Sequence, residues 1–121
     1  MILLIDDAPG MDRLVAMILE GLGGPVVQAV NLAGALAAAR AEAPGVVLLD
    51  LALGEEDGLA ILPTLRGEPA LSRVPVVGFT VHESRRHEAM EAGLAGFVVK
   101  PFTSQALRKV LEPYLTADQA V

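Results

Sequence analysis

The sequence predicts an α/β fold in which a parallel sheet carries helices on both faces, and two observations support this prediction. Short apolar runs of strand length alternate with longer segments of helical period, which is the pattern of repeated βαβ units. The pair of elements repeats five times, and 121 residues is a common length for one domain. We therefore expect a single domain over residues 1–121, built from five strands and five helices.

The first repeat begins with a strand over Ile2–Ile5 and continues into a helix that ends at a glycine-rich segment. The apolar face of this helix consists of Met11, Leu14, Val15, Ile18 and Leu22. The second strand covers Val26–Val30 and is followed by Asn31, a favourable N-cap residue. The helix that starts there carries Leu32, Leu36 and Ala39 and ends before Pro44.

The third strand, Val46–Leu49, is apolar without interruption. This pattern indicates burial on both faces, as at the centre of a parallel sheet. A loop over Leu51–Gly58, rich in glycine and acidic residues, follows this strand and leads to a helix near Leu59–Arg66.

The fourth repeat places a strand at Val74–Thr80 and a helix at roughly Ser84–Ala92. The fifth strand is Phe97–Lys100, and the last helix begins near Thr103 or Ser104. We interpret two basic pairs as solvated helix faces: Arg85 with Arg86, and Arg108 with Lys109.

The composition excludes several classes of protein. With 53% hydrophobic and 20% charged residues the chain is too apolar for disorder, and a formal net charge of −6 opposes contact with nucleic acid. The absence of cysteine excludes disulfides, thiolate metal sites and thiol nucleophiles, and fits a reducing cytosol. There is no basic leader segment and no apolar stretch near the roughly 18 residues of a membrane span. We expect a soluble, cytoplasmic protein without nucleic-acid or membrane partners.

Polar side chains that can do chemistry follow four of the five predicted strands. They are Asp6 and Asp7, Asp50, Thr80, and Lys100. Because the carboxyl ends of parallel strands meet at one edge of a sheet, these groups should converge in one crevice. The second strand ends without such a group, and it would lie at the sheet edge in a flavodoxin-like order 2-1-3-4-5.

The three carboxylates would repel one another unless a cation offsets them. Oxygen ligands without histidine or cysteine select Mg²⁺, Mn²⁺ or Ca²⁺, and a site open to phosphate favours Mg²⁺. Lys100 needs an anionic partner, which Asp50 or a phosphoryl group would supply. The set matches phosphoryl transfer to a carboxylate. A solvated acidic loop without an ion, and a lysine that merely extends from a strand end, are the alternative interpretations.

Four segments of the chain have the order and spacing of the motifs of one known family. They are Leu3-Leu4-Ile5-Asp6-Asp7, then Val47-Leu48-Leu49-Asp50 with Asp57-Gly58 seven and eight residues on, then Pro75-Val76-Val77-Gly78-Phe79-Thr80, and finally Lys100-Pro101-Phe102. Together they resemble the receiver domain of two-component response regulators, in the single-domain, chemotaxis-regulator-like form. The resemblance covers the whole chain and implies a flavodoxin-like doubly wound (βα)5 sandwich.

The resemblance assigns a phosphorelay role to the site. It implies that Asp50 is the phosphoacceptor and takes its phosphoryl group from a sensor histidine kinase or a histidine phosphotransfer protein. Mg²⁺ would lie between Asp7, Asp50 and the backbone carbonyl of Ala52, with Asp6 acting partly through water. The chain would then catalyse only its own phosphorylation and dephosphorylation.

The resemblance also implies how the signal leaves the site. Lys100 and Thr80 would hold phosphoryl oxygens, the Lys100-Pro101 bond would be cis, and Thr80 and Phe97 would act as the switch. Signal transduction would pass to a downstream protein through the face made by the fourth helix, the fifth strand and the fifth helix. We expect a monomer or a weak homodimer.

Two features depart from the family pattern or leave a choice open. Val81 follows Thr80 where a smaller residue is more usual, so it would narrow access if it faces the pocket mouth. His82 would either orient the hydrolytic water or be an exposed loop residue. The chain is expected to be free-standing, although a piece of a hybrid kinase is an alternative.

Two other functions compete with the phosphorylation-controlled switch. One is a receiver-like scaffold that binds partners without being phosphorylated. The other is a haloacid-dehalogenase-like phosphatase, but its nucleophile belongs to an Asp-x-Asp motif, whereas Asp6 and Asp7 are adjacent.

Overall fold

The computed structural model describes residues 1–119, with side-chain environments given up to Leu115. Its main sheet has five strands in the order β2-β1-β3-β6-β7, and all neighbouring strands pair in parallel. The strands are β1 Ile2–Ile5, β2 Val26–Ala29, β3 Val46–Asp50, β6 Val76–Thr80 and β7 Gly96–Val99. The observed order confirms the predicted flavodoxin-like α/β fold, since β6 and β7 are its fourth and fifth strands.

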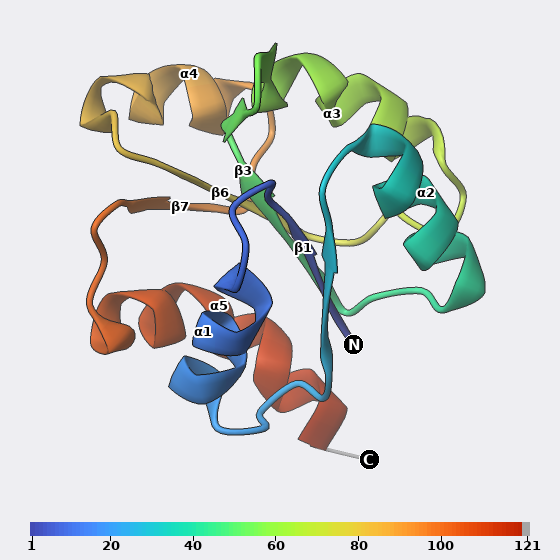
Figure 1. Ribbon diagram of the computed structural model, residues 1–121, viewed down its shortest axis with the longest axis vertical. Coiled ribbons are helices and arrows are strands. Elements are labelled where there is room, and N and C mark those ends of the chain that lie inside the picture. The colour runs from blue at the N-terminus through green and yellow to red at the C-terminus, as the bar shows by residue number, and fades with distance from the viewer. Residues whose placement is uncertain (120–121) are drawn as a thin grey trace.

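Helices cover both faces of this sheet, as Figure 1 shows. Helices α1 and α5 pack on one face, while α2, α3 and α4 lie over the other. Their bounds are α1 Met11–Leu19, α2 Leu32–Ala41, α3 Gly58–Gly67, α4 Arg86–Glu91 and α5 Ser104–Gln119. The layered arrangement is what right-handed βαβ connections produce when the chain winds in both directions from the first strand.

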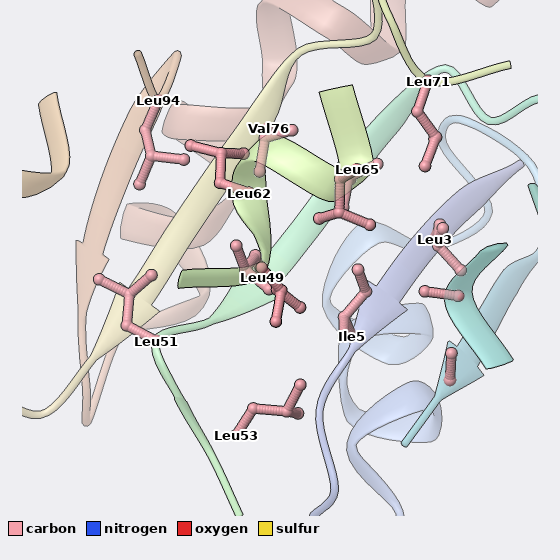
Figure 2. Close-up of a cluster of buried hydrophobic side chains, with 14 of the residues drawn as sticks. Leu3, Ile5, Leu49, Leu51, Leu53, Leu62, Leu65, Leu71, Val76 and Leu94 are labelled. Atoms are coloured by element: carbon pink, nitrogen blue, oxygen red, sulfur yellow. The ribbon is translucent and has the colours of Figure 1, made fainter. Parts of the chain in front are cut away.

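Strands β1 and β3 are apolar on both faces, and both faces of each strand are buried. Along β1, Ile2 and Leu4 pack toward α1 and α5, whereas Leu3 and Ile5 face the opposite layer. Figure 2 shows this second layer, in which Leu49 of β3 lies among leucine side chains of neighbouring elements. Strand β3 is buried along its whole length, which confirms the burial expected from its uninterrupted apolar run.

The segment after β3 differs from the predicted loop. Residues Ala52–Leu53 (β4) and Glu56–Asp57 (β5) form a short antiparallel hairpin, and Gly54 in its turn has φ +60°. The side chain of Leu53 is buried and anchors the hairpin to the core. Strands of two residues have no measurable hydrophobic period, which is why the sequence pattern did not reveal them.

Most other element boundaries shift by one or two residues from the prediction, but α1 ends at Leu19, so Leu22, predicted on its apolar face, lies in the turn that follows. Strand β6 starts at Val76 because Pro75, which has no N–H, contributes only its carbonyl to Val47. The fourth helical segment opens with a 3₁₀ turn, η1, at Glu83–Arg85 before α4 begins. Lys100 lies just beyond the end of β7 rather than inside it. None of these shifts moves a site residue away from the sheet edge.

Candidate functional site

The carboxyl ends of β1, β3, β6 and β7 bring the predicted site residues together. One carboxylate oxygen from each of Asp6, Asp7 and Asp50 lies within 4.8 Å of the others. Lys100 Nζ is 3.5 Å from Asp50 Oδ2 and 3.9 Å from Asp6 Oδ2. The convergence predicted from the ends of the apolar runs is therefore confirmed for the acidic residues and for the lysine.

The three carboxylates differ in burial, so the site has a buried part and a part that faces solvent. Asp6 is fully buried, Asp50 is nearly so, and Asp7 is exposed. Asp6 Oδ1 accepts a hydrogen bond from the Ala8 N–H at 2.9 Å, and Asp50 Oδ1 accepts one from the Ala52 N–H at 2.9 Å. These bonds leave Oδ2 of each buried carboxylate directed into the crevice.

Within the described residues, Asp6 Oδ2 is the one buried side-chain oxygen or nitrogen without a hydrogen-bond partner. Burial raises the pKa of Asp6, the Ala8 hydrogen bond lowers it, the charge of Asp50 raises it and Lys100 lowers it, with the rise prevailing. Three carboxylates against one ammonium leave an excess of two negative charges. A buried oxygen that accepts no hydrogen bond, in an oxygen-only, acidic donor set, fits a hard divalent cation such as Mg²⁺.

Thr80 is buried at the end of β6, beside Lys100. The Lys100 N–H donates to the Thr80 carbonyl at 2.8 Å, so the two residues are tied at the backbone. Thr80 Oγ1 accepts a hydrogen bond from the N–H of His82 at 3.3 Å, which leaves the hydroxyl proton free to donate elsewhere. The His82 side chain itself is exposed, as one of its two expected interpretations required.

The structure also shows where Pro101, Phe97 and Ala52 lie, the other residues to which the family resemblance gives a role. The Lys100-Pro101 peptide bond is cis, as expected. Phe97 on β7 is buried, and the guanidinium carbon of Arg86 lies 4.8 Å from its ring centroid. Ala52 begins β4 with its side chain exposed and its N–H on Asp50.

An apolar groove of about 370 Å³ lies beside the ammonium of Lys100. It is lined by Met11, Leu14, Val81, Lys100, Pro101 and Phe102. Val81 is 59% exposed and stands at this groove, so it does face the surface beside the site. The polar crevice therefore opens next to an apolar wall made by α1 and the segment after β7.

Arg85 has a role that the sequence interpretation missed. It was expected on a solvated helix face, but its side chain is only 22% exposed. Its guanidinium binds the carboxylate of Asp57 on the β4–β5 hairpin and reaches the Leu51 carbonyl at 3.5 Å. Asp57 lies 28 residues from Arg85 in the sequence, and no local sequence pattern predicts a contact between residues so far apart.

Comparison with known proteins gives a consistent result. The family model for the response regulator receiver domain matches residues 2–112. The transcriptional regulatory protein KdpE of Mycobacterium tuberculosis is 37% identical over 102 residues, which are 84% of this chain and 45% of that protein. The chain thus spans less than half the length of this relative.

Solved structures share the fold over nearly the whole chain. Chemotaxis protein CheY4 of Vibrio cholerae has a TM-score of 0.81 at 25% identity and covers 94% of this chain and 97% of its own. The receiver domain of sensor histidine kinase PA1611 from Pseudomonas aeruginosa, with a magnesium ion coordinated in its active site cleft, has a TM-score of 0.78 at 25% identity. That match covers 95% of this chain and 96% of the other. Within residues 1–119, no helix has the length and apolar character needed to cross a membrane.

Proposed function

Because the chain belongs to the response regulator receiver domain family, we propose that it is a phosphorylation-controlled switch with Asp50 as phosphoacceptor. Receiver domains are typically non-enzymatic signalling modules of two-component systems that work with histidine kinases. The observation that carries the proposal is the position of Asp50. Its carboxylate lies at the end of a central strand, within 4.8 Å of Asp6 and Asp7 and 3.5 Å from Lys100.

The proposed cation is Mg²⁺, held by Asp7, Asp50 and the backbone carbonyl of Ala52, with Asp6 acting partly through water. The oxygen-only donors, the absence of a hydrogen bond to Asp6 Oδ2 and the exposed Asp7 support this choice. When bound, the ion supplies positive charge to phosphoryl oxygens and to the crowded carboxylates. The magnesium ion in the PA1611 receiver domain is a further supporting observation.

In the proposed reaction, a carboxylate oxygen of Asp50 attacks the phosphorus of a phosphohistidine on a sensor histidine kinase or histidine phosphotransfer protein. An O–P bond forms, the P–N bond breaks, and its electron pair goes to the imidazole nitrogen, which then takes a proton. Lys100 and the Thr80 hydroxyl, both at this edge of the sheet, would bind phosphoryl oxygens. The chain itself acts on no other substrate.

The signal would pass from the site to a surface. Thr80 and Lys100 share a backbone hydrogen bond, and Phe97 lies on the strand that Lys100 follows. We propose Thr80 and Phe97 as the switch residues and the face of α4, β7 and α5 as the contact surface for a downstream protein. The wider proposal is one receiver domain over residues 1–121, acting in the cytoplasm as a monomer or weak homodimer.

Intact-protein mass spectrometry tests this function directly. The protein is incubated with Mg²⁺ and a small phosphodonor such as acetyl phosphate, and we expect it to gain the mass of one phosphoryl group. Asp50→Asn should gain none. Glu42→Gln is the matched control, because the Glu42 side chain is exposed, lies outside the three-carboxylate cluster and should leave labelling intact.

Other outcomes distinguish the competing functions. Absence of labelling in the wild-type protein, with and without the partner kinase, would identify a scaffold. Repeated hydrolysis of a generic phosphate ester would identify a phosphatase.

A further inference from the structure

Gln28 on β2 holds the chain segment that carries two of the three site carboxylates. Its side-chain Nε2 donates to the Asp6 carbonyl at 2.7 Å and to the Ala8 carbonyl at 2.8 Å. Its Oε1 accepts a hydrogen bond from the Asp12 N–H at 2.9 Å. Both amide protons and the amide oxygen are therefore used on the connection between β1 and α1.

The far end of this connection depends on Gln28 because helix α1 lacks a capping side chain of its own. Its N-cap is Gly10, with φ +83° and no side-chain hydrogen bond. The first N–H groups of a helix need acceptors from outside the helix. Gln28, sixteen residues away on another strand, supplies that acceptor to Asp12.

The near end of the connection is held by the same strand. Gln28 is in register with Leu4, and the ladder continues past β1 through a 3.0 Å bond from the Asp6 N–H to the Ala29 carbonyl. Strand β2 therefore binds residues 6–12 at both ends and in the middle, where Ala8 accepts from Gln28.

The chemistry of this side chain suits the place where it acts. Repulsion among Asp6, Asp7 and Asp50 favours a connection that moves outward when no cation is bound. A neutral amide restrains the backbone without adding a charge to the site. A carboxylate in its place would lose both donors and bring a further negative charge to the carbonyls of Asp6 and Ala8.

We propose that Gln28 is a positioning residue for the divalent cation, fixing the β1–α1 connection so that the Asp6 and Asp7 carboxylates are held in place before the ion arrives. This inference rests on the proposed function, because it requires that the acidic cluster bind the cation. All three hydrogen bonds of the Gln28 side chain go to backbone atoms, so Gln28 would act on the cation only through the residues that it holds. Its effect is confined to the cost of arranging the ligands.

The test measures Mg²⁺ binding by isothermal titration calorimetry, without any phosphodonor. Gln28→Met has nearly the same size and makes none of the three hydrogen bonds. We expect its Mg²⁺ dissociation constant to rise about tenfold, the lower end of what losing an outer-shell contact costs. In metal-free protein, the Asp12 amide should also exchange its hydrogen faster. In labelling experiments the half-saturating Mg²⁺ concentration should rise, while the rate at saturating Mg²⁺ changes little.

Asn31→Ala is the matched control. It removes the N-cap bond to the Gly34 N–H just after β2, so it costs stability without touching the acidic connection. Its Mg²⁺ affinity should equal that of the wild type. Should Gln28→Met fail to fold, Gln28→Val, which suits a strand and makes no hydrogen bond, replaces it.

Two outcomes separate this inference from the proposed function. If the wild type binds Mg²⁺ and folded Gln28→Met binds it equally well, Gln28 has no positioning role and the proposed function stands. If the wild type binds no Mg²⁺ at millimolar concentration, the cation site itself is wrong and the inference is overturned with it.

Discussion

The guanidinium of Arg85 donates to both carboxylate oxygens of Asp57 at 3.0 Å, which joins the segment after β6 to the hairpin after β3. These two segments follow Thr80 and Asp50, the residues proposed as switch and phosphoacceptor. The carboxylate of Asp57 also caps α3 by accepting from the Leu59 N–H at 3.0 Å. The pair therefore restrains the two chain segments that flank the site on one side.

A double-mutant cycle measures this restraint. Arg85→Met and Asp57→Asn, alone and combined, should show a coupling of about 0.5–1 kcal/mol in urea unfolding, because Arg85 Nη2 contacts both carboxylate oxygens but the pair is partly exposed. Asp57→Asn keeps an oxygen for the α3 cap, so the coupling reports the pair alone. The coupling should shrink in high salt. Additive effects of the two substitutions would show that the contact contributes nothing.

Removal of the site ammonium should strengthen cation binding and impair signalling. In Lys100→Met the three carboxylates lose the positive charge that lies 3.5 Å from Asp50 and 3.9 Å from Asp6. Mg²⁺ titration should therefore give a smaller dissociation constant than in the wild type. Lys109→Met, in the exposed part of α5, is the matched control and should leave the dissociation constant of Mg²⁺ unchanged.

We also expect phosphorylated Lys100→Met to keep its fold but to lose phosphorylation-dependent partner binding. Partner binding that still responds to phosphorylation would rule out the role given to Lys100.

The raised pKa of Asp6 predicts how metal-free stability depends on pH. The folded protein holds the proton of the Asp6 carboxyl more tightly than the unfolded chain does. Protonation of Asp6 below its folded pKa therefore raises the free energy of unfolding. That gain is lost as pH rises from the usual value of 3.8 through the raised one. Asp6→Asn should therefore be more stable than the wild type at pH 7 and should lack this pH dependence. Chemical unfolding between pH 4 and pH 7 without Mg²⁺ measures both effects. A wild type that gains stability from Asp6 ionisation over this range would contradict the prediction.

Two glycines of helix α3 should respond oppositely to alanine. A Cβ on Gly58 would meet the Asp50 carbonyl oxygen and would lie 2.7 Å from the Leu51 Cα, both backbone atoms that cannot turn away. A Cβ on Gly67 would meet nothing within 4 Å. We expect Gly58→Ala to lower the free energy of unfolding by about 2 kcal/mol or more, and Gly67→Ala to raise it by up to about 1 kcal/mol. Thermal melts of the two variants decide the matter, and equal effects would be inconsistent with this packing.

The sequence was most informative where many residues carry the same signal. Alternating apolar runs and helical periods predicted every strand of the main sheet to within two residues, because burial on both faces leaves a continuous pattern. The acidic residues and Lys100 were predicted to meet because they stand at strand ends, and parallel topology alone brings strand ends together.

The features that sequence reasoning missed depend on single contacts between distant residues. Gln28 looks like an ordinary polar residue of an edge strand, and its role exists only because β2 lies beside the β1–α1 connection. Arg85 was assigned to a solvated face because its partner, Asp57, belongs to a hairpin too short to leave a pattern. The assigned roles of the site residues in catalysis and switching remain predictions for the experiments above.

The site residues come from four separate strands, so the site exists only when the whole domain is folded. An unfolded chain has no place where Asp6, Asp50 and Lys100 meet, so any ion that binds the cluster acts only on the native state. A cation at one hundred times its dissociation constant would raise the unfolding free energy by about 2.7 kcal/mol. The melting temperature of this protein should therefore rise with the concentration of the bound cation and report its binding.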